Sequence, residues 1–391
     1  MNRKEKIDEL VKQNEKQLDS HRQFYKIHFD DYGMDFAFQW LLGSSRHGGC
    51  EIGEAFYTAA QITDPNSWSE EWVKTAERVE IKAKKAESAG HKVSAREFYL
   101  RAANYYRMAM MSMSPLGSRI TTTEKARSCM KKASQLFDPV IESISIPFEN
   151  RELPGYFIKA NKDGRKSKTL IAVGGGETYA EDMYFHIAPS ALIRGYNFLT
   201  VDIPGQGHTP SQGLYFRPDT EVPIKAIVDY ALCRPEVDPE YIAAYGISAG
   251  GYFVPRAAAH DHRIKACIAN YGITDFRKIL AAMAFNYRMV ETVVWRWNTS
   301  TDNWKTLIDR NEDYIFNPKD IICPVLLIIS AGEYKNPVVK AMQHEFIEAL
   351  PNSNKKMIVG SFEEGAGTHC YGENTGLVSS LLFDWLDEIF S

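Results

Sequence analysis

Residues 241–259, with the sequence YIAAYGISAGGYFVPRAAA, carry the strongest signal in the chain. An apolar run typical of a buried strand ends at Gly246-x-Ser248-x-Gly250, and an alanine-rich stretch that favours a helix follows at once. So sharp a turn needs glycines, because neighbouring side chains would collide, and it leaves the serine at the positive end of a helix. This context is that of a nucleophile elbow, so we predict that Ser248 is a nucleophile.

Short apolar runs alternate with helix-length segments around this stretch, from Lys168 to the C-terminus. The runs are TLIAVGGG (169–176), NFLTVDIPG (197–205), YIAAYGIS (241–248), KACIANYG (265–272), PVLLIIS (324–330) and KKMIVGS (355–361). Ahead of them, residues 140–160 read as a hairpin that turns at 150–153. The pattern predicts the α/β class, with a mostly parallel central sheet and helices on both faces. The segment 275–318 is too long for a simple crossover and predicts a helical insertion.

The first 135 residues show helical patterning almost throughout. Residues 67–90 begin with a Ser-x-x-Glu capping box and stop at Gly90, and residues 93–113 repeat this design with a cap at Ser94. Two such helices joined by a short loop predict an antiparallel pair. We therefore expect two domains, a helical one at 1–135 and an α/β domain at 136–391.

Composition narrows the possible partners and the compartment. The chain has 391 residues and a formal net charge of -4, with basic and acidic residues interspersed, so no nucleic-acid partner is expected. No apolar run approaches the roughly 20 residues of a membrane helix, and the first residues are charged, so we expect a cytoplasmic protein without a membrane partner. The six cysteines form no C-x-x-C pair, which predicts reduced, mostly buried thiols. No metal or organic cofactor is implied, and the oligomeric state is left open, with a homodimer as one option.

A serine nucleophile needs a general base and an oxyanion hole. His369 lies in a glycine-bearing loop after the last predicted strand and before a C-terminal helix, which is where the base of such a fold belongs. One oxyanion donor should be the backbone N–H of Ala249, and the second should come from the loop GGGETYAED, where we favour Gly176. That loop lacks both nucleotide-binding glycine motifs, so phosphate binding is not expected.

The segments GGGET, DIPGQGHTP, GISAGGY, GTHC and FDWLDEIF, in this order after a helical region, resemble the α/β-hydrolase superfamily. More narrowly, they resemble the branch that contains 2,6-dihydroxypseudooxynicotine hydrolase and the fungal polyketide-shortening hydrolases of the yellowish-green pigment type. The resemblance covers about residues 90–391. It implies cleavage of a carbon–carbon bond next to a ketone by serine, histidine and an acid, beneath a helical lid. It also implies an acidic residue in the loop after the early strand, and Glu177 occupies that position.

Glu177 has two interpretations. A lid that removes water from its carboxyl group would let it donate a proton to the leaving carbanion or orient the substrate. As a surface residue near a helix N-terminus, it would only favour the helix dipole.

The third member of the triad departs from the family pattern. The stretch SAGEYKNP (330–337) has Asn336 where the family places an aspartate, and asparagine supplies no negative charge. Glu333 lies closer to the strand end and has a longer side chain, and Asp275 follows the preceding strand. We favour Glu333 as the acid, with Asn336 and Asp275 as the alternatives.

These residues predict a serine hydrolase that cleaves a carbon–carbon bond next to a ketone, or an ester, in a fairly large apolar or aromatic small molecule. Tyr105, Tyr106 and Met108, together with aromatic residues such as Phe36, are candidates for the substrate pocket, although such residues at helical spacing are more often core. The alternatives are an esterase or peptidase of the same fold, and a non-hydrolytic lyase, cyclase or acyl transferase on this scaffold.

Overall fold

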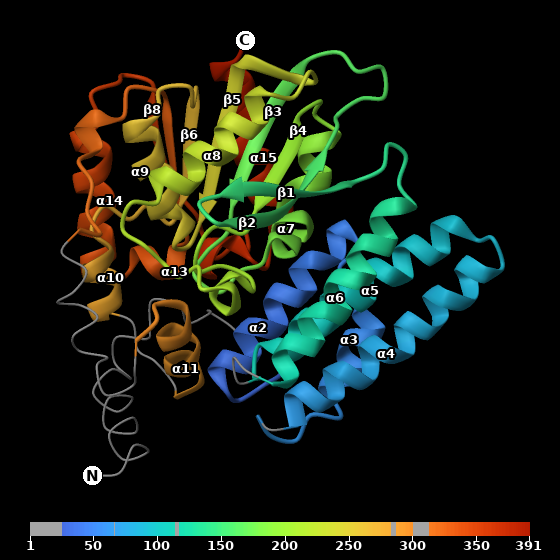
Figure 1. The fold of residues 1–391 in the computed structure, drawn as a ribbon. Helices are drawn as coiled ribbons and strands as arrows, with labels where there is room; N and C mark the ends of the chain where they lie inside the picture. Colours follow the sequence, from blue (N-terminus) through green and yellow to red (C-terminus); the bar gives the residue numbers. More distant parts are fainter. Residues whose placement is uncertain (1–25, 66, 114–116, 283–286, 300–312) are drawn as a thin grey trace.

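Eight strands form one mixed sheet in the computed structural model, which describes residues 26–65, 67–113, 117–282, 287–299 and 313–391 (Figure 1). The strands are β1 (Glu142–Phe148), β2 (Arg151–Ile158), β3 (Ser167–Val173), β4 (Asn197–Val201), β5 (Val237–Ile247), β6 (Ala266–Asn270), β7 (Val325–Ile329) and β8 (Lys355–Val359). Their order is β1-β2-β4-β3-β5-β6-β7-β8, and the pairs from β4 to β8 are parallel. The predicted α/β class is confirmed.

Burial along the strands follows from their place in the sheet. Every residue of the interior strands β4, β6 and β7 is buried, as expected for parallel strands with helices on both faces. The edge strand β8 is partly exposed, and its two lysines lie at its first positions. The helices α8 (Glu221–Leu232) and α9 (Gly250–His260) cover one face, and α7 (Ala180–Leu192) and α15 (Thr375–Ile389) cover the other (Figure 1).

The predicted hairpin exists, but its turn is shorter than expected. Phe148 pairs with Arg151, so only Glu149 and Asn150 form the turn, and residues 151–153 already belong to β2. Glu149 has a φ of 51°, which a tight two-residue turn demands. The expected turn at 150–153 was therefore wrong, because the strand pairing extends to the turn itself.

The N-terminal helices gather beside α7 at one end of the sheet (Figure 1). They are α2 (Tyr32–Gly43), η2 (Ser44–His47), α3 (Ile52–Ala59), α4 (Ser67–Ser88), α5 (Lys92–Met110) and α6 (Ser118–Gln135). The pair α4 and α5 is antiparallel as predicted, since Trp68 Nε1 donates to Met108 O at 2.8 Å while Tyr99 donates to Glu87 near the connecting loop. The cap expected at Ser94 was wrong, because α5 already begins at Lys92.

Helices also lie between β6 and β7, where an insertion was expected. They are α10 (Phe276–Ala282), α11 (Tyr287–Arg296) and η5 (Pro318–Asp320). Parts of the expected insertion, 283–286 and 300–312, lie outside the described residues. The remaining helices are η3 (Thr209–Gln212), α13 (Ala331–Tyr334), α14 (Pro337–Ala349) and η6 (His369–Tyr371).

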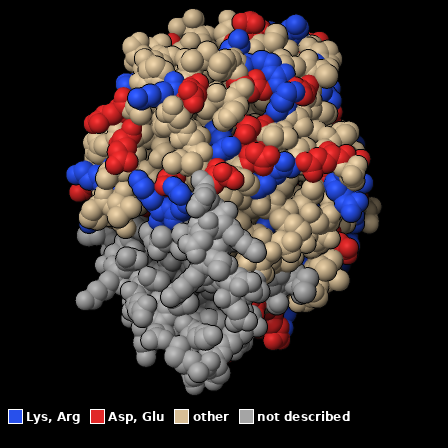
Figure 2. All heavy atoms as spheres, turned by 60° about the vertical axis from the view of Figure 1, so that its left-hand side comes forward, with Lys and Arg blue, Asp and Glu red and all other residues tan. Residues whose placement is uncertain are grey.

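The described surface mixes charges of both signs on the face shown in Figure 2. Five of the six cysteines are buried and Cys233 is exposed, in line with the expected reduced thiols. In the described ranges, none of the helices combines the length and the apolar character needed to cross a bilayer.

Candidate active site

Ser248 occupies a strained turn between β5 and α9. Its φ is 53°, in the left-handed region that few residues other than glycine adopt. A Cβ on Gly246 would lie 2.0 Å from Gly250 O, and one on Gly250 would lie 2.6 Å from Val173 O. Both glycines are therefore required by the close approach of backbone atoms. The serine itself is only half-buried, so its side chain remains accessible at the end of the sheet.

The glycine loop after β3 lies directly against this serine. A Cβ on Gly175 would meet Ser248 Cβ at 2.7 Å and Ser248 Oγ at 3.1 Å, so only glycine fits without a shift. Gln206 holds the loop by donating from Nε2 to Gly174 O at 2.6 Å and to Gly175 O at 2.9 Å. Gly176 lies near Ala249, since a Cβ built on it would be 3.9 Å from Ala249 Cβ. Gly176 and Ala249, the residues predicted to supply the oxyanion donors, thus lie close together beside the serine.

His369, on η6, contacts the buried carboxylate of Glu333. Its Nδ1 hydrogen-bonds Glu333 Oε1, while Ser330 Oγ donates to the other carboxylate oxygen at 2.8 Å. Glu333 is 0% exposed and lies on the short helix α13, which begins where β7 ends. Burial by itself would lower the pKa of His369, but the neighbouring Cys370 and Glu333 outweigh burial and hold this pKa well above its ordinary value.

Cys370 lies between the histidine and the serine. Its Sγ is 3.6 Å from His369 Nε2 and accepts a hydrogen bond from Ser248 N at 3.2 Å. Cys370 also has a positive φ, 56°, as does Tyr271, 78°, whose ring lies 5.2 Å from the His369 ring. Backbone strain of this kind is typical of functional sites. The contacts place His369 Nε2 and Ser248 on two sides of one sulfur atom.

The two alternative acids have other partners. Asn336 caps α14, where its Oδ1 accepts from Val338 N at 2.9 Å and from Val339 N at 3.3 Å. Asp275 forms an ion pair with Arg277 at 3.0 Å. The structure therefore brings Glu333, and neither alternative, into hydrogen-bond contact with His369 among the contacts described for these side chains.

The helical part supports the histidine loop through α2. Thr368 Oγ1 donates to Gln39 Oε1 at 3.1 Å, and the ring of Phe36 lies 6.4 Å from that of His369. Phe36 was among the residues considered for the pocket. Gln39 was missed, because a glutamine on an amphipathic helix carries no signal in the sequence.

Glu177 is half-buried in the glycine loop, and its backbone oxygen accepts from Arg107 Nη2 at 2.8 Å. Its carboxylate lies within electrostatic reach of Arg107 and Arg296. Neither arginine was predicted to be near the site, because both come from helices distant in sequence.

The expected pocket residues Tyr105 and Tyr106 belong to the core of the helical part, which corrects that prediction. Tyr105 is fully buried, donates to Glu54 at 2.9 Å and packs 5.6 Å from the Trp72 ring, and Tyr106 donates to Glu80 at 2.8 Å. Met108 is also buried, beside Trp68. These side chains hold α3, α4 and α5 together, as residues at helical spacing usually do.

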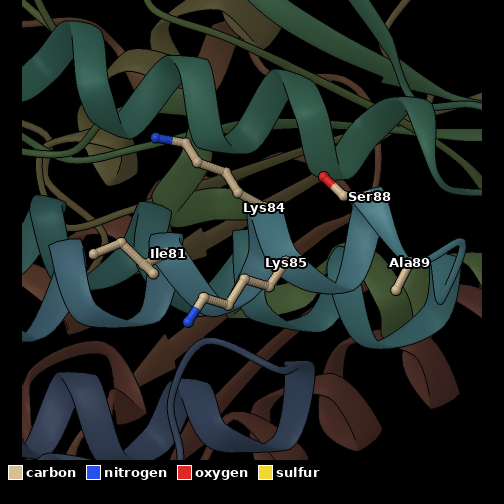
Figure 3. Close-up of a pocket in the computed structure, with 5 residues that line it drawn as sticks. All are labelled: Ile81, Lys84, Lys85, Ser88 and Ala89. Atoms are coloured by element: carbon tan, nitrogen blue, oxygen red, sulfur yellow. The ribbon is translucent and has the colours of Figure 1, made fainter.

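A hollow on the helical part lacks the chemistry of an active site. It runs along α4 and is lined by Ile81, Lys84, Lys85, Ser88 and Ala89, with the two lysines turned to opposite sides (Figure 3). Nothing in it pairs a nucleophile with a base. In the described part of the chain, no group of three histidine, cysteine or acidic residues could hold a metal ion.

The strand order, the elbow and the histidine loop after β8 define the fold as that of the α/β-hydrolases. The model of the FrsA-like esterases matches residues 56–293, so the chain belongs to the FrsA-like esterase family. The match begins within the helical part, well before residue 90. The resemblance inferred from the sequence is confirmed, and the protein is an enzyme of the hydrolase class.

Two fungal relatives and one solved structure are similar to this chain. The α/β-hydrolase ucsC of Acremonium sp. is 35% identical over 67% of this chain, and the aligned part spans only 58% of that relative. The 20-hydroxy-prefusarin hydrolase FUS2 of Gibberella moniliformis is 28% identical over 94% of this chain and 98% of its own length. The structure of 2,6-dihydroxy-pseudo-oxynicotine hydrolase aligns with a TM-score of 0.75 at 20% identity, over 89% of this chain and 95% of that chain, which shows the shared fold.

Proposed function

We propose that the protein is a serine hydrolase that cleaves a carbon–carbon bond next to a ketone, or an ester, in a fairly large apolar or aromatic small molecule, such as a polyketide-like compound. One observation carries this proposal. His369 has its Nδ1 on the buried Glu333, and its Nε2 lies 3.6 Å from Cys370 Sγ, the atom that also accepts from Ser248 N at the elbow. A carboxylate fixes the tautomer of such a histidine and stabilises the imidazolium that forms when it accepts a proton.

The reaction begins when Ser248 Oγ attacks the carbonyl carbon and its proton passes to His369 Nε2. The alkoxide that develops on the substrate accepts hydrogen bonds from the N–H groups of Ala249 and Gly176, two residues that lie close together beside Ser248. The electron pair of the broken bond leaves with the carbanion or alkoxide, which takes up a proton from the His369 imidazolium or from Glu177, and water then releases the acyl group from the serine.

We place Glu177 on the leaving-group side of this reaction, because it follows Gly176 and its backbone oxygen accepts from Arg107 of the helical part. It protonates the leaving carbanion or orients the substrate. An ester distinguishes these roles, because an alkoxide leaving group depends less on a proton donor than a carbanion does. A loss in Glu177→Gln that is confined to diketones would support proton donation, and an equal loss on esters would support orientation.

Labelling by a fluorophosphonate tests the proposal directly, since the reagent modifies an activated serine without knowledge of the substrate. We expect labelling of the intact protein and none in Ser248→Ala. A folded wild-type protein that is not labelled would refute the serine-hydrolase proposal. Product identification from a panel of β-diketones and aryl esters would then decide between carbon–carbon and ester cleavage.

The non-hydrolytic alternatives were considered because Asn336 stands where the family places the aspartate of the triad. Because Glu333 contacts His369 in the place where that aspartate would act, this ground for a lyase, cyclase or acyl transferase is removed. A peptidase or simple esterase would differ from the proposed enzyme only in its substrate. Adding aryl amides to the same panel distinguishes these activities.

A further inference from the structure

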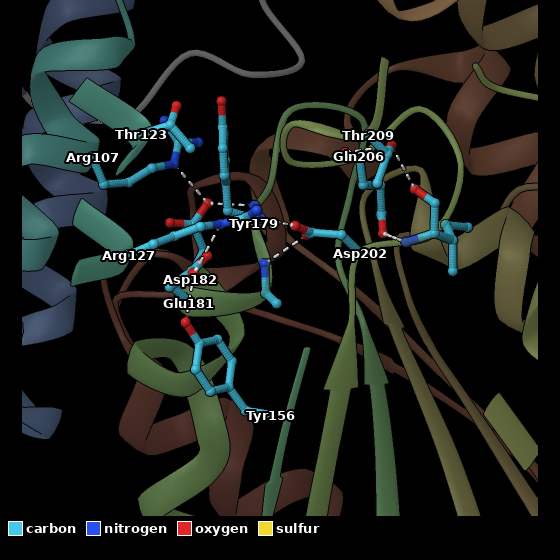
Figure 4. Close-up of polar contacts among 12 residues, drawn as sticks. Arg107, Thr123, Arg127, Tyr156, Tyr179, Glu181, Asp182, Asp202, Gln206 and Thr209 are labelled. Carbon is cyan, nitrogen blue, oxygen red and sulfur yellow. Dashed lines mark hydrogen bonds and ion pairs between the residues drawn. The ribbon is translucent and has the colours of Figure 1, made fainter. Parts of the chain in front are cut away.

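Four arginines converge where the helical part meets the glycine loop, and two of them are neutralised there. Arg107 Nε lies 3.0 Å from Asp182 Oδ2, and Arg127 Nη2 lies 2.5 Å from Asp202 Oδ2 (Figure 4). Asp182 also accepts from Tyr179 N at 3.0 Å. These pairs account for their charges within the fold, so Arg107 and Arg127 have structural partners.

The other two arginines have no carboxylate partner among the residues that the structure describes. Arg119, 2% exposed, donates to Met113 O at 3.1 Å and reaches the Tyr179 hydroxyl at 3.4 Å. Arg296, 0% exposed, donates from Nη1 to Gly205 O at 2.5 Å. Neither forms an ion pair with an acidic side chain among the residues that the structure describes.

Arg296 is the more unusual of the two, because its Nε and Nη2 are buried and have no hydrogen-bond partner in the described structure. Burial lowers the pKa of Arg296 to about 10, so the guanidinium still carries its charge at neutral pH. A buried charge with unpaired donors is costly, and folded proteins keep one where a ligand, an ion or a water molecule supplies the missing acceptor.

The surroundings fit the flat anionic end of an organic molecule. Tyr179 lies beneath the guanidinium group of Arg296 at 5.9 Å, and the Trp295 ring lies 5.3 Å from the same group. His208, 6.0 Å from Trp295, has an unpartnered buried Nδ1. His208 and Trp295 are only half-buried, so solvent reaches this side of the cluster.

Arg296 is linked to the candidate nucleophile Ser248 through Gln206 and the glycine loop. Gly205, which accepts from Arg296, precedes Gln206, and Gln206 donates to Gly175 O. Gly175 is in turn packed against Ser248. An anionic group bound at Arg296 would therefore lie on the loops that surround the reacting carbonyl.

We propose that Arg296 and Arg119, with Tyr179, form a subsite that binds an anionic oxygen group of the substrate, either a carboxylate or the oxygen of an acidic 1,3-dicarbonyl enol. Guanidinium groups bind both through paired N–H donors. The inference rests on the proposed function, which it deepens by defining the substrate as an acid. The subsite holds the molecule by this end while its ketone or ester lies at Ser248.

Matched pairs of ligands test the subsite in wild-type protein. The first pair is 3-phenylpropanoate and 3-phenylpropanamide, and the second is an acidic cyclic 1,3-dione and its neutral methyl enol ether. We expect the acid of at least one pair to slow fluorophosphonate labelling, and to raise the melting temperature, at roughly tenfold lower concentration than its neutral partner. The pair that responds identifies the source of the anionic oxygen.

Substitutions then assign the effect to the arginine. Arg296→Met should abolish the preference for the acid, and Arg296→Lys, which keeps the charge but not the two unpartnered N–H groups, should weaken it and serves if the first variant does not fold. Arg256→Met is the control, because Arg256 is paired with Glu221 and its remaining donors reach Tyr252, Asp313 and Ile315. It should leave the preference unchanged.

Labelling rate and melting temperature together distinguish a failure of the serine-hydrolase proposal from a failure of the subsite proposal. If the folded protein is not labelled, the serine-hydrolase proposal fails, yet melting temperatures still report on the subsite. If acid and neutral partners act equally on wild type in both pairs, or if the preference survives in both Arg296→Met and Arg296→Lys, the subsite is refuted.

Discussion

Replacing Glu333 by glutamine tests the assignment of the acid with almost no change of shape. In wild type, Ser330 Oγ donates to the Glu333 carboxylate. In the variant, the amide oxygen of glutamine can still accept from His369 Nδ1, and its NH₂ group can donate to Ser330 Oγ. The tautomer of the histidine is therefore kept and only the charge is lost. Two charges roughly 4 Å apart in protein surroundings interact by about 4 kcal/mol, so Ser248 should react about 10³-fold more slowly.

The assay is the rate of fluorophosphonate labelling as a function of pH. In wild type, the labelling rate increases with pH as His369 loses its proton. Because the pKa of His369 is held above its ordinary value, this increase occurs at a higher pH than for an ordinary histidine. Removing the negative charge of Glu333 destabilises the imidazolium and lowers that pKa. The rise should therefore move to lower pH in Glu333→Gln while the plateau falls.

Glu364→Gln is the matched control. Ser361 Oγ donates to Glu364 at 2.8 Å, and Glu364 N donates back to Ser361 at 3.2 Å, which repeats the local arrangement of Ser330 and Glu333 on an exposed turn. This variant should label like wild type. If Glu333→Gln labels within threefold of wild type and its pH profile does not move, Glu333 is not the acid.

Three other substitutions test the surroundings of the site. Gly175→Ala would bring a methyl group to 2.7 Å from Ser248 Cβ, and the displaced serine should label roughly a hundredfold more slowly in a protein that still melts cooperatively; an unchanged rate would refute the tight packing. Gln206→Leu removes the donors to the glycine loop and should slow labelling about tenfold while lowering the free energy of unfolding by about 1–3 kcal/mol, whereas a purely structural role would lower the stability and leave the labelling rate unchanged. Arg127→Met leaves Asp202 buried without its ion pair and should lower the free energy of unfolding by about 3 kcal/mol in a denaturant titration; a loss below about 1 kcal/mol would contradict this.

The α/β class, the strands and the elbow could be predicted because their signals are local. An apolar run of five residues bounded by turns reads as a buried strand wherever it occurs, and Gly246 is required by Gly250 O in the same turn. Gly250 was predicted from the elbow motif, although the atom that requires it, Val173 O, lies on another strand. His369 could be placed because the order of elements in this fold leaves one loop for it. The turn at Glu149 was misplaced because pairing between neighbouring strands, which the sequence does not show, decides where a hairpin turn begins.

The pocket residues were wrong for a related reason. Tyr105 and Tyr106 lie on α5 at the spacing of both a core and a pocket, and only the packing of α3 and α4 against them shows that they are core. Arg296 was not considered at all, since one arginine in an amphipathic helix is ordinary until its donors are seen to be buried without partners.

The sequence by itself determined the fold and predicted the serine from residues close together in the chain, and it predicted the loop of the histidine from the order of the elements. It could not choose among Glu333, Asn336 and Asp275, since all three follow strands whose ends meet at the same edge of the sheet. Tertiary structure distinguishes their contacts: Glu333 on α13 is buried against His369, while Asn336 caps α14 and Asp275 pairs with Arg277. Only the contact between side chains 36 residues apart reveals which oxygen atom reaches the imidazole.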